Sequence, residues 1–135
     1  MPTSSFTFLR RLLIADAVVS GATGVLMAAA ASTLEQFLGV PAPLVQYAGL
    51  ILLPFAAGVG WLAFQDPPAP AGVKMVIAAN GAWVVGSILL LLPGGIDPNA
   101  LGLVFIIVQA AVVAVLGELQ YVGLRKSVRG PLPVR

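Results

Sequence analysis

The chain has 135 residues, of which 59% are hydrophobic and only 9% are charged, and its formal net charge is +2. About a quarter of the residues in a typical water-soluble domain are charged, so this composition excludes a soluble globular protein and indicates that lipid covers most of the surface. The sequence contains no cysteine and no histidine. This excludes disulfides, thiolate nucleophiles and the usual ligands of zinc, copper and haem, and we expect no metal and no cofactor.

Four apolar segments are each long enough to cross a hydrocarbon core of about 30 Å, which takes about 20 residues of α-helix. They cover approximately residues 12–31, 44–64, 75–92 and 100–124. The stretches between them are rich in Pro, Gly, Asp and Asn, which end helices. The sequence therefore predicts one all-α membrane domain over residues 1–135, an antiparallel bundle of four transmembrane helices with short loops.

The first segment carries Asp16 among apolar residues. Ser20 and Thr23 follow it at spacings of four and seven residues, so the three side chains share one helix face. A charge inside the bilayer is costly unless it finds polar partners. We expect Asp16 to face the interior of the bundle, either protonated or as a hydrogen-bonded carboxylate, with Arg10 and Arg11 as further candidate partners.

A short helix is expected between the first and second segments. Ser32 or Thr33 can cap it, and Glu35 lies three residues after Ser32, as in a capping box. Three apolar residues of this helix then share one face, which lies on the membrane surface or closes the outer end of the bundle: Leu34, Phe37 and Leu38.

Pro54 lies in the middle of the second segment. Proline removes one backbone hydrogen bond and clashes with the preceding turn, so it predicts a kink near the bilayer centre. A static kink and a functional hinge both fit this position.

The third and fourth segments carry the other polar residues of the membrane interior. Asn80, Trp83 and Ser87 share one face of the third helix. Gln109 lies deep in the fourth helix, and we expect it to bridge to Ser87 or to a backbone carbonyl freed by Pro54.

Counting residues from the basic end of each helix places Asp16, Asn80 and Glu118 at a similar depth. Each lies five to seven residues from the basic residue nearest to it at the end of its helix, which corresponds to about 8–10 Å. We therefore expect a polar layer of Asp16, Ser20, Asn80 and Glu118. For Glu118 an alternative is that it reaches Arg125 or interfacial water.

Small residues recur at four-residue spacing, which allows transmembrane helices to pack closely. These small residues either allow packing within one chain or form a homodimer face. They are Ala17 and Gly21, Ala56 and Gly60, Ala78, Ala82 and Gly86, and Ala110 and Ala114.

The two halves of the chain also resemble each other. "GLILLPFAAGV" at 49–59 is similar to "GLVFIIVQAAV" at 102–112, and "IADAVVSGATGVL" is similar to "IAANGAWVVGSILL". With one residue inserted in the second copy, such similarity is consistent with a parallel repeat of two helices each. The alternative is that apolar helices resemble one another by chance.

The basic residues predict the orientation. All seven fall on one side of a four-span bundle: Arg10, Arg11, Lys74, Arg125, Lys126, Arg129 and Arg135. The other side receives Glu35 and Asp97. By the positive-inside rule both termini are expected in the cytoplasm.

The segments "GLVFIIVQAAVVAVL" and "ELQYVGLRK", together with the four-span layout, resemble small uncharacterised bacterial inner-membrane proteins. The resemblance covers the whole chain and implies an inner-membrane location, but it implies no activity.

No motif indicates an enzyme, and the few basic residues indicate topology rather than nucleic-acid binding. We interpret the chain as a non-catalytic multi-pass membrane protein, an accessory or scaffold subunit that binds a membrane-protein partner or a second copy. The alternative is a small secondary transporter or channel that uses Asp16 as its titrating group.

Overall fold

The computed structural model describes residues 4–129, and the side chains of residues 6–127. The described chain forms five helices and no strand: α1 (Ser4–Ala29), α2 (Ala31–Leu38), α3 (Ala42–Ala63), α4 (Pro70–Leu90) and α5 (Ala100–Arg129). All except α2 are long and apolar enough to cross a membrane. The predicted all-α class with four candidate membrane-spanning helices is therefore confirmed.

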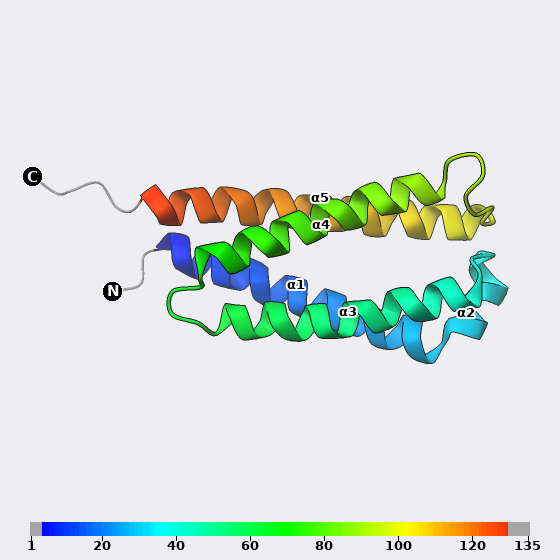
Figure 1. Cartoon of the computed structure of the whole chain (residues 1–135), viewed down its shortest axis with the longest axis horizontal. Coiled ribbons are helices and arrows are strands. Elements are labelled where there is room, and N and C mark those ends of the chain that lie inside the picture. Colours follow the sequence, from blue (N-terminus) through cyan, green and yellow to red (C-terminus); the bar gives the residue numbers. More distant parts are fainter. Residues whose placement is uncertain (1–3, 130–135) are drawn as a thin grey trace, which may run out of the picture.

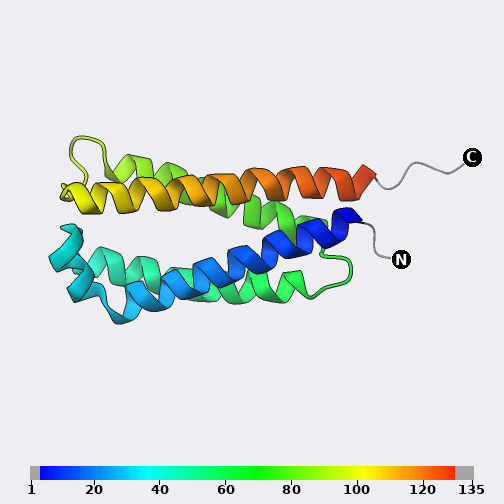
Figure 2. The same ribbon diagram turned by 180° about the vertical axis from the view of Figure 1, so that it is seen from behind.

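The long helices lie side by side in two pairs, α1 with α3 and α4 with α5 (Figures 1 and 2). α1 also packs against α5, whereas α3 and α4 share few contacts. Among the described residues the backbones of α1 and α4 are not neighbours, so these two parallel helices lie on a diagonal of the bundle. We call the end that carries Arg10, Lys74 and Arg125 the basic end, and the end that carries α2 the opposite end.

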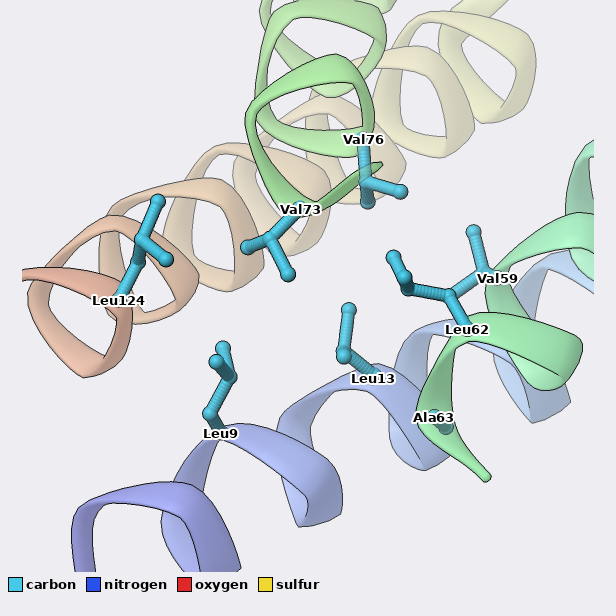
Figure 3. Packing of buried hydrophobic residues seen from close by; sticks show 8 residues of the cluster. All are labelled: Leu9, Leu13, Val59, Leu62, Ala63, Val73, Val76 and Leu124. Atoms are coloured by element: carbon cyan, nitrogen blue, oxygen red, sulfur yellow. The ribbon is translucent and has the colours of Figure 1, made fainter. Parts of the chain in front are cut away.

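Buried apolar side chains form a cluster at each end of the bundle. The cluster at the basic end takes residues from all four long helices (Figure 3): Leu9, Leu13, Val59, Leu62, Ala63, Val73, Val76 and Leu124. The cluster at the opposite end includes Leu38 of α2 and Ile106 of α5. Most of the remaining large apolar side chains are exposed on the outside of the bundle, as expected where lipid is the solvent.

Three helices extend beyond the predicted segments. α1 begins at Ser4, α4 begins at Pro70, and α5 continues to Arg129. An apolar run marks the part of a helix that lies in lipid, but it does not mark where the helix ends. In α1, Leu9 is fully buried, so the turn before the apolar segment belongs to the packed bundle.

The predicted capping box is wrong. α2 begins directly after Ala30, and no side chain caps it. The Glu35 carboxylate instead accepts a hydrogen bond from the backbone N–H of Ala42, the first residue of α3. A helix N-terminus has N–H groups without intrahelical partners and favours a negative charge.

The apolar face predicted for α2 is divided. Leu38 is buried and Leu34 packs partly against the opposite-end cluster, whereas Phe37 is 61% exposed. α2 therefore closes the opposite end of the bundle with two of these residues and presents the third to its surroundings.

Glycine brings α1 and α3 into close contact. A Cβ atom added to Gly49 would lie 2.8 Å from the Gly24 carbonyl oxygen and 2.6 Å from the Ala28 nitrogen. Further along the same pair, Gly21 lies near Ala56. The small residues of these two helices therefore serve packing within the chain.

The small residues of α4 have a different environment. Ala78, Ala82 and Gly86 are exposed, and a Cβ atom at Gly86 would meet nothing within 4 Å. They do not contribute to packing between the described helices.

Pro54 lies inside α3, which continues on both sides of it. Because Pro54 has no backbone N–H, the carbonyl of Leu50 lacks the hydrogen-bond donor that a helix normally provides. The kink remains a prediction: a bend of the helix axis above about 20° at Pro54 would support it, and a straight axis through residues 48–60 would contradict it.

Candidate functional site

Four buried side chains from three helices form one hydrogen-bonded group, which we call the Asp16 cluster: Asp16, Ser20, Asn80 and Gln120. The Ser20 hydroxyl donates to Asp16 Oδ1 at 3.0 Å. Asn80 Nδ2 and Gln120 Nε2 both donate to Asp16 Oδ2, at 2.9 and 2.7 Å. Asn80 Nδ2 also donates to Gln120 Oε1 at 3.0 Å. The predicted convergence of Asp16, Ser20 and Asn80 is confirmed.

Helix geometry explains how the group assembles. Ser20 lies one turn from Asp16 on α1, so its hydroxyl reaches back to the carboxylate. Asn80 comes from the diagonal helix α4, and Gln120 comes from α5, which contacts both α1 and α4. Each helix therefore contributes a side chain from the face it turns toward the others.

A turn of apolar residues separates the cluster from the basic end. Leu13, Val76 and Leu124 lie three or four residues from Asp16, Asn80 and Gln120 respectively, in the direction of the basic end. All three belong to the buried apolar cluster in Figure 3. Asp16 is only 1% exposed and Gln120 is fully buried. The carboxylate thus lies in a closed, low-dielectric environment.

The carboxylate is held by neutral donors. Its two oxygens accept three hydrogen bonds, from one hydroxyl and two amides. Among the side chains that the structure describes, no buried polar atom lacks a partner. No cation among the described residues forms an ion pair with Asp16.

Arg10 does not pair with Asp16. Its guanidinium donates to the backbone carbonyls of Ala63 and Gln65 at 2.9 and 3.0 Å, and lies 3.4 Å from the Asp66 carboxylate. The carbonyls at the end of α3 have no partners within the helix, and Arg10 lies close to them. Arg11 is exposed.

Glu118 does not belong to the cluster, contrary to prediction. It lies on the exposed side of α5, while Gln120, two residues along, faces the interior. Two residues in an α-helix are about 200° apart, so only one of them can face inward. The prediction used depth alone, and for this reason it assigned Glu118 to the cluster in place of Gln120.

Gln120 was missed, although the sequence contained a signal for it. The interior face of α5 repeats at three- or four-residue intervals through seven residues: Ile106, Ala110, Val113, Gly117, Gln120, Leu124 and Ser127. Val113 and Gly117 are half-buried and the other five are buried. This helical phase places Gln120 inside and Glu118 outside.

A second polar group joins α4 and α5 nearer the opposite end. Trp83 Nε1 donates to Gln109 Oε1 at 2.7 Å, and Gln109 Nε2 donates to Ser87 Oγ at 3.0 Å. The predicted bridge from Gln109 to Ser87 is confirmed. Its backbone partner is the carbonyl of Ile106 in the same helix, and not a carbonyl freed by Pro54.

The chemistry available to the Asp16 cluster is narrow. It has one titratable group, and the described residues contain no group of three or more acidic residues that could hold a metal ion. The cluster can fix helices in place, or it can bind and release a proton or a small cation at Asp16.

The chain matches no protein-family model, no curated protein and no solved structure.

Proposed function

We propose that this chain is a non-catalytic multi-pass membrane protein that serves as an accessory or scaffold subunit, in which the Asp16 cluster holds the two helix pairs together. The observation that carries this proposal is the complete hydrogen bonding of a carboxylate that is 1% exposed. Its donors come from α1 and from both helices of the other pair. A polar group saturated in this way favours a single helix arrangement.

A subunit without an internal reaction site acts through its outer surface. The exposed sides of the long helices are almost entirely apolar, so the partners we propose are lipid and other membrane proteins or a second copy. Small residues on the exposed side of α4 would permit a close approach by another helix.

We further propose an inner-membrane location in a bacterial cell, with both termini in the cytoplasm. The basic end carries Arg10 and Lys74, whereas Glu35 and Asp97 lie at the opposite end. The positive-inside rule supports this orientation.

Reporter fusions test the orientation. Alkaline phosphatase fused after Asp97, in the loop between α4 and α5, is expected to be active, and the same fusion after Gln65 is expected to be inactive. The enzyme folds into its active form only outside the cytoplasm. The reverse pattern of activities would contradict the proposed orientation.

A second candidate function is supported by one specific observation. Among the described residues no cation forms an ion pair with Asp16, and an intramembrane carboxylate with neutral partners is suited to bind a proton or a small cation. The second proposal is a small transporter or channel that uses Asp16 as its titrating group.

Proteoliposomes distinguish the two proposals. We expect vesicles containing the protein to show no more proton or sodium flux than empty vesicles, measured with an enclosed ion-sensitive dye under an imposed gradient. Asp16→Asn is expected to lower the thermal stability in detergent. Flux through the wild type that Asp16→Asn abolishes, at unchanged stability, would overturn the accessory function in favour of transport.

A further inference from the structure

Glu118 is a carboxylate on the outer surface of the membrane-spanning part of α5. It is exposed, and the depth of this position follows from hydrogen bonds. Arg10 marks the basic end of the bundle, where its guanidinium binds the end of α3. Asp16 lies six residues further along α1, and Gln120 lies at the level of Asp16 because the two side chains are hydrogen-bonded. Glu118 is two residues beyond Gln120, so it lies about 12 Å from the level of Arg10, well inside the hydrocarbon layer.

The chain itself provides no partner for this carboxylate. No hydrogen bond or ion pair joins Glu118 to another residue whose side chain is described. Arg125 lies seven residues away, about 10 Å along the helix axis, and its guanidinium is placed over the Tyr121 ring, 5.7 Å from the ring centroid. The expected contact between Glu118 and Arg125 is not formed.

The surface around Glu118 is suited to contact with another helix. Ala111, Val115 and Val122 lie on the same side of α5 and are exposed. We call these residues together with Glu118 the Glu118 face. Their side chains are short, so a second helix can approach closely enough to reach the carboxylate.

A second copy of the chain does not provide the complementary charge. Two copies in the same membrane orientation that meet at this face about a two-fold axis would place their Glu118 carboxylates at equal depth. The exposed basic residues of such a copy lie at other depths, because Arg11, Lys74 and Arg125 are each about 10–12 Å from the level of Glu118, toward the basic end. A cation at the right depth must come from a different protein.

We propose that the Glu118 face binds a transmembrane helix of another membrane protein that carries lysine or arginine at the depth of Glu118. A carboxylate facing hydrocarbon is unfavourable, and an ion pair with a desolvated cation removes much of this cost. The proposal rests on the accessory function proposed above and specifies the chemistry of its partner.

Designed probe helices test the proposal in vesicles. The protein, labelled at a cysteine introduced by Asp97→Cys, is reconstituted with labelled polyleucine helices that carry one arginine at the matching depth, one arginine seven residues away, or none. Energy transfer is expected to show about tenfold tighter association for the matched arginine. Glu118→Gln is expected to remove this preference while leaving the thermal stability unchanged.

Equal association of the three probes with the wild type would overturn the proposal, and so would a preference that survives Glu118→Gln. Energy transfer between two labelled copies that Glu118→Gln abolishes would assign the face to self-association and would also overturn it. The comparison of the three probes uses the labelled protein with Glu118 intact, so it does not depend on the Glu118→Gln variant. None of these results alters the flux measurement, so a failure of this proposal and a failure of the proposed function are distinguishable.

Discussion

Asn80→Leu is expected to lower the free energy of unfolding by about 3 kcal/mol, because it leaves a buried carboxylate with fewer donors. The Asn80 amide donates both to Asp16 and to Gln120. Without it, Asp16 retains only Ser20 and Gln120 as donors, and Gln120 Oε1 loses its donor.

Asp16→Leu is expected to cost less, about 1–2 kcal/mol, although it removes the centre of the cluster. This substitution removes the buried carboxyl group itself, and the bond between Asn80 and Gln120 can persist. The double variant is expected to lose less stability than the sum of the two single variants, because the residues share one network.

The measurement is reversible unfolding in mixed micelles, followed by circular dichroism. Ala79→Leu provides a matched control, since Ala79 neighbours Asn80 on α4 but is exposed, and its effect is expected within about 0.5 kcal/mol. If Asp16→Leu lowers the free energy of unfolding at least as much as Asn80→Leu, the hydrogen bonds of the carboxylate stabilise the fold by more than its burial costs. The expected order of the two variants is then wrong.

The membrane-spanning helices and the depth of their polar residues were predictable from the sequence. Lipid requires long apolar segments, and the rise of an α-helix converts residue counts into depth. Residue counts alone therefore place Asp16 and Asn80 at the same level. The direct bond between them across the diagonal also fits a parallel two-helix repeat, which remains a hypothesis.

The rotation of each helix was not predictable from depth. Glu118 and Gln120 differ in depth by about 3 Å but lie on opposite sides of α5. The small residues show the same limit: those of α3 face α1, whereas Ala78 and Ala82 of α4 face outward. The spacing of small residues does not specify which neighbour they face, because rotation depends on the packing of all the helices together.

The contacts that polar side chains of α1 and α2 make with the ends of α3 were also not predictable from the sequence. Arg10 is 53 residues from Ala63, and nothing local indicates that its guanidinium binds the end of α3 rather than Asp16. Glu35 likewise binds the start of α3 instead of its own helix. In both cases a polar side chain binds a backbone group at an end of α3 that has no partner within the helix.

Gly49→Ala is expected to lower the free energy of unfolding by about 2–3 kcal/mol through overpacking. The added Cβ atom would lie 2.6 Å from the Ala28 nitrogen, 2.8 Å from the Gly24 carbonyl oxygen and 2.8 Å from Met27 Cβ. Two of these atoms belong to the backbone of α1 and the third is fixed to it, so no side-chain rotation relieves the contact. α1 and α3 must move apart, which separates the most closely packed helices of the bundle.

Gly58→Ala is the matched control, because Gly58 lies in the same helix and a Cβ atom there would meet nothing within 4 Å. This variant is expected to be neutral or to gain up to about 1 kcal/mol from helix propensity. Gly24→Ala should fall between the two, since its shortest contacts would be 3.0 Å. The order of the three effects follows the distances at which α1 and α3 approach each other. Equal effects of Gly49→Ala and Gly58→Ala would show that the two helices do not meet at Gly49.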